Sequence, residues 1–220
     1  MLTAIWPSFA RLPNHLPASA DITTSGMVAY FLYHLVQLPF LFVPPYKLKY
    51  LFVAKMIILP PMIIAMTIYL AVKAGGASEF YHAPPRLHGS ARAWQWLSGM
   101  TSVTGGTATL ALNNSDWSRF SKSVNSQIWQ FPALTIFQTA VGVCGIIGAC
   151  ASQKLYGQII WNPIEIIDQW QGSSGGRAAA FFCSAAWLLA QVSINLSTNS
   201  VAFATGEFVI WFRRVVSEIM

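Results

Sequence analysis

The stretch AAAFFCSAAWLLAQVSINLSTNSVAFATG, residues 178–206, contains no charged side chain. The segment between Lys122 and Lys154 is also free of charge. Each of these segments holds roughly 30 residues, whereas about 20 apolar residues suffice to cross a bilayer as a helix. Three further uncharged runs lie at residues 22–46, 56–72 and 93–115. The pattern predicts a polytopic membrane protein.

The composition supports an all-α membrane helix bundle. Charged residues make up 9% of the chain, whereas a soluble domain uses about a quarter. Lipid offers no partner for free backbone N–H and C=O groups, so only helices or closed barrels cross it, and a barrel would show short alternating segments. The net charge of +6 could suggest nucleic acid, but the Lys and Arg residues form no continuous patch. We expect no nucleic-acid partner.

Five spans fit the chain. Residues 1–21 are expected to form a loop because prolines interrupt any helix there. Residues 152–177 are expected to form a long connector, and a double proline, Pro60-Pro61, is expected to kink or break the second span. The predicted spans cover residues 27–43, 51–72, 94–112, 128–151 and 178–205.

The distribution of Lys and Arg among the short loops predicts the orientation. The turns YKLKY (46–50) and DWSRFSK (116–122) fall on one side of the alternation, together with Arg213 and Arg214. Short loops rich in Lys and Arg stay in the cytoplasm, so the connector that carries Glu165 is expected outside.

The third span contains TSVTGGTATL, residues 101–110. Each glycine of the Gly105-Gly106 pair costs about 1 kcal/mol relative to alanine in a continuous helix. Small residues allow close packing of membrane helices. Alternatively, the pair marks a discontinuous helix whose unwound backbone lines a substrate site. The residues alone leave both interpretations open.

The fifth span contains QVSINLSTNS, residues 191–200. Gln191, Asn195 and Asn199 are spaced by four, so they share one helical face. Polar amides at this depth usually face a partner helix or a wet cavity, and Ser and Thr hydroxyls can bond back to the preceding turn. The three amides therefore indicate either a lined cavity or hydrogen bonds between helices. Amides suit a planar, uncharged solute better than an ion.

No catalytic constellation is recognisable. Cys144, Cys150 and Cys183 lie inside apolar runs without a CxxC pair, which is typical of packing. The sequence contains no phosphate-binding loop, metal-ligand cluster or nucleophile motif. We expect no enzyme activity, no cofactor and no metal.

Four segments carry a family resemblance: AIWPSFARLPNHLPAS (4–19), MTSVTGGTATLALNNSDWSRFSKS (100–123), YGQIIWNP (156–163) and GGRAAAFFCSAAWLLAQVSINLSTNS (175–200). In order and spacing they resemble the nucleobase:cation symporter family one, in its fungal uracil/allantoin permease branch. Members of that family have twelve spans and a core of two inverted five-helix repeats with broken helices. The resemblance places the five spans here at spans four to eight of that plan.

The resemblance also implies site residues. An asparagine of the eighth span hydrogen-bonds the nucleobase in the family, and its position corresponds to Asn199. A Gly-Trp pair of the sixth span corresponds to Gly106 and Thr107, and Thr107 cannot stack on a base. These three residues are the substrate-binding residues that we expect.

Cation coupling in sodium-dependent members uses oxygens of the eighth span. The corresponding positions here are Ala190, Ser193 and Ile194. Ile194 has no side-chain oxygen, so the resemblance implies coupling to protons rather than sodium.

The implied function is proton-coupled symport of a nucleobase or related compound (uracil, allantoin, or a purine or cytosine) across the plasma membrane. The family's first and third spans have no counterpart here, and residues 206–220 align with no family segment. We therefore expect a truncated transporter that does not transport alone. The alternative is a non-transporting scaffold that associates with a full-length permease.

Overall fold

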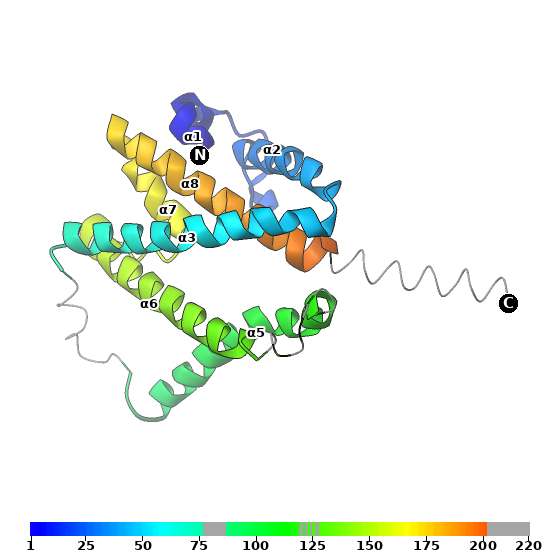
Figure 1. Ribbon diagram of the computed structural model, residues 1–220. Coiled ribbons are helices and arrows are strands. Elements are labelled where there is room, and N and C mark those ends of the chain that lie inside the picture. The colour runs from blue at the N-terminus through cyan, green and yellow to red at the C-terminus, as the bar shows by residue number, and fades with distance from the viewer. Residues whose placement is uncertain (77–86, 119–120, 122, 124, 126–127, 202–220) are drawn as a thin grey trace.

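The computed structural model describes residues 1–76, 87–118, 121, 123, 125 and 128–201. The described residues form helices and no strand, which confirms the predicted all-α class (Figure 1). The elements are α1 (Leu2–Ile5), η1 (Pro7–Arg11), η2 (Ala18–Ala20), α2 (Thr24–Leu41), α3 (Pro45–Lys73), α5 (Gly89–Ser118), α6 (Gln130–Tyr156), α7 (Pro163–Asp168), η4 (Gln169–Gly172), α8 (Ser174–Asn195) and the π-helical turn η5 (Leu196–Val201).

Over the described residues each predicted span overlaps a helix, and residues 202–205 of the fifth span lie outside them. Among the described residues, three helical segments are long and apolar enough to cross a membrane: Tyr46–Lys73, Pro132–Tyr156 and Ser174–Ser200. They correspond to α3, α6 and α8 with η5. The spans expected at α2 and α5 are helical, and their passage through the membrane stays a prediction.

The helix α3 runs without interruption through Pro60 and Pro61. A break at this pair, one of the two outcomes expected from the sequence, is therefore not observed. Proline removes one backbone donor and crowds the preceding turn, and membrane helices tolerate it where the freed carbonyls find other partners. Pro45, by contrast, occupies the first turn of α3, where no N–H donor is needed.

The core lies where α3 packs against α6 and α8 (Figure 1). Met66 and Leu70 of α3 meet Ala151 of α6 and Ala180 of α8 in one buried cluster. The two alanines present little side chain, which lets the helix backbones approach closely. Of the three apolar segments, the one in α8 is the most enclosed: in its most apolar stretch of 18 residues 33% are buried, against 6% in each of the others.

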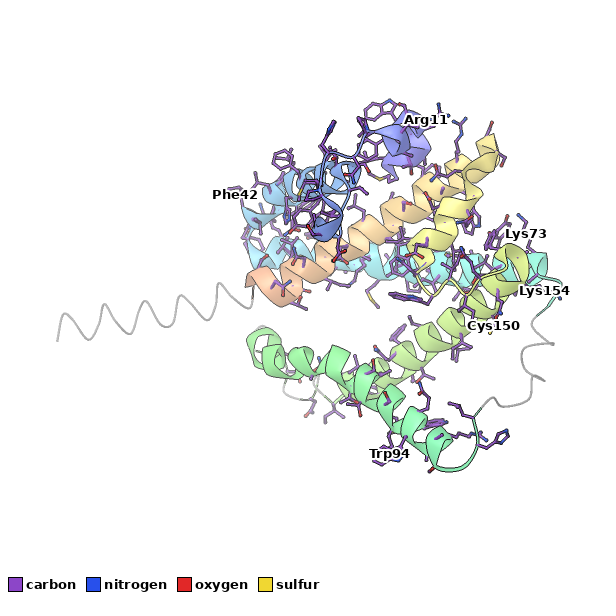
Figure 2. All side chains as sticks on the ribbon, turned by 180° about the vertical axis from the view of Figure 1, so that it is seen from behind. Arg11, Phe42, Lys73, Trp94, Cys150 and Lys154 are labelled. Carbon is purple, nitrogen blue, oxygen red and sulfur yellow. The ribbon has the colours of Figure 1, made fainter. Side chains whose placement is uncertain are left out.

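A second buried cluster joins the opposite end of α8 to the start of α3. It consists of Leu48, Val192 and Leu196, with Tyr33 and Phe40 of α2 packed against it. Because the two clusters pair opposite ends of α3 and α8, these helices run antiparallel. Figure 2 accordingly places Phe42, after α2, at one end of the bundle and Lys73 and Lys154 at the other.

Two regions outside the predicted spans contain helices: residues 1–21, for which the predicted loop was wrong, and the connector at residues 152–177. In residues 1–21, α1 packs against α8, and Thr3 Oγ1 accepts a hydrogen bond from Gln171 Nε2 at 3.0 Å. Pro7 does not prevent the following turn because it stands at the first position of η1. In residues 152–177, α7 buries Ile166 and Ile167 in the core. Tertiary burial stabilises these short helices, which local pattern alone does not predict.

The segment YGQIIWNP turns the chain from α6 into α7. Gly157 ends α6 in the left-handed conformation, with φ of 75°, which glycine adopts without steric cost. Asn162 begins α7 by accepting a hydrogen bond from Ile164 N at 3.0 Å. Between them, Ile160 N donates to the buried Ser152 Oγ at 2.8 Å. One buried hydroxyl therefore fixes the return of the chain.

The glycine-rich segment before α8 allows a close approach of two backbones. A Cβ atom added at Gly176 would lie 1.9 Å from the carbonyl oxygen of Trp170. A Cβ added at the neighbouring Gly175 would meet no atom within 4 Å. Packing therefore requires a glycine at position 176 but not at position 175.

We expect Gly176→Ala to lower the free energy of unfolding by about 1–3 kcal/mol, which is typical of overpacking. Gly175→Ala is the matched control, and we expect no loss of stability from it. Thermal unfolding of both variants in the same detergent measures the difference. Equal unfolding midpoints would contradict the close contact with Trp170.

A second expectation concerns the two fully buried serines. Ser152→Ala leaves the buried Ile160 N–H without its acceptor, which costs about 1–3 kcal/mol. Ser193 Oγ donates to Leu189 O of its own helix at 2.7 Å, so Ser193→Ala removes only an additional bond to a helical carbonyl and we expect a smaller loss. Thermal unfolding compares the pair. A larger loss in Ser193→Ala would refute the assigned role of Ser152.

Candidate substrate-binding site

An amide pair joins α2 to α8. Asn195 Nδ2 donates a hydrogen bond to Gln37 Oε1 at 2.8 Å, between residues 158 positions apart in the chain. Gln37 is 5% exposed, and Asn195 is half-buried. A buried polar group is costly unless it is hydrogen-bonded, so each amide satisfies the other. For these amides the sequence indicated either a lined cavity or hydrogen bonds between helices. At Asn195 the structure shows a hydrogen bond between helices.

Asn199 lies where α8 changes its winding. The α-helix ends at Asn195, and a π-helical turn continues from Leu196 to Val201. Single π-helical turns inside α-helices are rare and are frequent at functional sites. Asn199 is exposed, and its Nδ2 donates to Asn195 Oδ1. The predicted substrate residue is thus linked through Asn195 to the buried Gln37.

Gln191 is one turn before Asn195 and faces a cavity. This cavity has a volume of about 850 Å³. Its wall includes Tyr33, Trp187 and Leu188, and the N-terminal segment contributes Trp6 among others. The cavity interpretation therefore applies to Gln191, whereas Asn195 makes the helix-to-helix bond.

Tyr33 connects the cavity with the amide pair. Its hydroxyl is buried and lies close enough to the Asn195 side chain to interact with it.

The three positions expected at a cation site differ in their surroundings. Ala190 and Ser193 are buried, whereas Ile194 is 45% exposed. Ser193 Oγ is engaged with Leu189 O. The hydroxyls of Ser197 and Thr198 both donate to Ile194 O, at 3.0 and 2.8 Å, so these side chains bond back to the helix as the sequence suggested.

Gly106 and Thr107 lie within α5, whose helix continues through both positions. Of the two interpretations of the glycine pair, an interrupted helix is not observed. Close packing is not observed at Gly105 either, since a Cβ added there meets no atom within 4 Å. Figure 2 shows Trp94, near the start of α5, away from the α3–α8 core. The side-chain surroundings of Gly106 and Thr107 lie outside what the structure describes, so their approach to Asn199 stays a prediction.

Sequence analysis overlooked Gln37 and Tyr33. The signal for Gln37 is the single amide inside MVAYFLYHLVQLPFLFV, residues 27–43, because an isolated polar group at that depth needs a partner. Its partner could not be identified before the helices were placed together.

A second cavity, of about 560 Å³, lies between the end of α3 and the start of α8. Tyr69, Lys73 and Trp170 contribute to its wall, and Lys73 Nζ donates to Tyr69 Oη at 3.0 Å. None of the site residues expected from the sequence lines it. Within the described ranges, no three His, Cys, Asp or Glu side chains are grouped so that they could hold a metal ion.

The sequence profile of the permeases for cytosine/purines, uracil, thiamine and allantoin matches residues 1–217. The chain therefore belongs to this permease family, as the resemblance implied. The match also includes residues 206–217, within the segment that we expect to lack a family counterpart. No solved structure matches the chain.

Curated relatives include permeases and transporters of two yeasts. The chain is 35% identical over 208 residues to an uncharacterised permease of Schizosaccharomyces pombe, covering 92% of this chain and 35% of the relative. It is 33% identical to the thiamine transporter of Saccharomyces cerevisiae (90% and 34%) and 29% identical to the uracil permease of the same yeast (89% and 31%). The chain thus spans about a third of the length of the relatives it matches.

These comparisons and the apolar helices make the chain a membrane protein of a permease family. Its relatives are permeases and transporters rather than enzymes, which agrees with the expectation from the sequence. The structure joins the exposed Asn199 of η5 to Asn195 of α8 by a hydrogen bond.

We expect Asn195→Ala to lower the free energy of unfolding by about 1–3 kcal/mol, because the buried Gln37 loses its hydrogen-bond donor. Asn199→Ala removes an exposed amide and is expected to cost less. Thermal unfolding in one detergent compares the two variants. A greater loss in Asn199→Ala would show that the Asn195–Gln37 bond does not hold α2 against α8.

Proposed function

We propose that this chain contributes the amide-lined part of a transport site for a nucleobase or a related nitrogen compound, and that transport is coupled to protons at the plasma membrane. The observation that carries the proposal is the Asn199 amide, which is exposed on a π-helical turn of a membrane helix and bonded to a second amide behind it. Membership of the permease family supports transport as the activity.

The chemistry of α8 and η5 supports an uncharged, hydrogen-bonding solute. No charged residue lies between Arg177 and Glu207, so an ion would find no opposite charge on this helix. Amides offer both donors and acceptors at fixed positions, which suits uracil or allantoin. Relatives are named as permeases for these two compounds.

The side chains at the cation positions support protons over sodium as the coupling ion. Sodium is a hard cation that needs several oxygen ligands, as other hard cations do. Ala190 and Ile194 supply no side-chain oxygen, and the Ser193 hydroxyl already donates to Leu189 O. We therefore propose that binding does not depend on sodium.

Ligand binding by the purified chain in lipid nanodiscs tests the proposal, with radiolabelled uracil, allantoin, cytosine, adenine and thiamine as probes. We expect at least one probe to bind equally well in sodium and in potassium buffer. Asn199→Ala should weaken this binding about tenfold or more, because one or two hydrogen bonds to the ligand are lost.

The matched control is Asn125→Ala, which removes an exposed amide outside the α8 and η5 segments and should leave binding unchanged. Unaltered binding in Asn199→Ala would reject Asn199 as a substrate residue. If none of the probes binds, the site proposal fails. Co-purification with a full-length permease would then favour the scaffold alternative.

A further inference from the structure

We infer that Gln37 of α2 is a positioning residue that fixes the orientation of the Asn199 amide, so that Asn199 presents its carbonyl oxygen to an N–H group of the ligand. The inference rests on the proposed function and deepens it. It assigns a role to α2, from which sequence analysis derived no site residue, and it specifies the hydrogen-bonding group that the ligand must supply.

The direction of the hydrogen bonds carries the argument. Each side-chain amide has an NH₂ donor and an oxygen acceptor. Gln37 Oε1 accepts from Asn195 Nδ2, and Asn195 Oδ1 accepts from Asn199 Nδ2. Both ends of the Asn195 amide are therefore used. Within the described residues, Asn199 Oδ1 accepts no hydrogen bond and is the open end of the chain of amides.

Burial of the side chains decreases from Gln37 through Asn195 to Asn199, as a positioning role for Gln37 requires. Gln37 is 5% exposed, Asn195 is half-buried and Asn199 is exposed. The innermost amide is held by packing of α2, whose Tyr33 and Phe40 lie against the second core cluster. A rigid inner residue can thus orient the outer one, because a site is oriented best when packed neighbours fix its side chains.

The direction of these hydrogen bonds limits which groups of a ligand can bind to Asn199. An open carbonyl oxygen accepts a hydrogen bond and cannot donate one. The uncharged surroundings in α8 favour a neutral N–H group over a cation. A nucleobase or ureide with at least one free N–H therefore fits, and an analogue with every ring nitrogen methylated does not.

The two hydrogen bonds that lead from Asn199 through Asn195 to Gln37 form a relay, and this relay can be measured without a ligand. The full chain is labelled with ¹⁵N in its asparagine side chains, and the NH₂ resonances of Asn195 and Asn199 are recorded in nanodiscs. Gln37→Met keeps the volume and removes the acceptor. We expect the Asn195 resonance to shift and its exchange with water to become faster, with a smaller change at Asn199. Unchanged resonances would overturn the inference.

Binding of radiolabelled uracil measures the consequence of the relay. We expect Gln37→Met to weaken binding roughly tenfold, as for the loss of one oriented hydrogen bond. Gln37→Glu retains an acceptor and should restore most of the affinity. Wild-type chain should bind 1,3-dimethyluracil at least about tenfold more weakly than uracil. Equal affinity for the two compounds, or equal binding by Gln37→Met and wild type, would overturn the inference.

Controls separate this inference from the proposed function. Gln138→Met alters an exposed glutamine of α6 and should change neither resonances nor binding. If Asn199→Ala lowers uracil binding but Gln37→Met does not, Asn199 keeps its substrate role and the positioning role fails. If wild-type chain binds no uracil, uracil as the ligand of the proposed function fails, and the resonances alone then decide whether the relay exists.

Discussion

The antiparallel packing of α8 against α3 is the contact on which the rest of the described fold depends. Small residues of α8, such as Ala180, allow Leu70 and Met66 of α3 to fill the space between the backbones. In lipid, helices gain little from apolar burial alone, so close van der Waals packing and interhelical hydrogen bonds must supply the association energy. With α8 in place, α1, α7 and η4 pack along its first half, and α2 packs at its end.

The same helix satisfies its polar residues in two ways. Hydroxyls such as that of Ser193 donate to a carbonyl of the preceding turn and need no partner on a neighbouring helix. The Asn195 amide, by contrast, donates to Gln37 on α2. The change from α to π winding at Leu196 follows directly after that bond. The last turn is therefore both anchored and irregular, as is common where a membrane helix meets a solute.

The sequence predicted the helical class and the positions of the five long helices because apolar length is a local property that survives folding. It also predicted that Gln191, Asn195 and Asn199 share a face. It missed α1 and α7, because short helices depend on burial against α8, and it missed Gln37, whose role depends on a partner 158 residues away. The predicted role of Gly106 and Thr107 likewise needs contacts between helices that the pattern does not contain.

By itself, therefore, the sequence determined that the chain settles in lipid as helices and which helix carries the amides. Over these lengths a helix in lipid satisfies the backbone within the segment and takes no ionised group into the bilayer. Only the tertiary structure decided which amide lines a cavity, which one joins two helices, and which one remains open. That division follows from the meeting of α2 with α8, because a hydrogen bond needs both partners in place at the correct distance and angle.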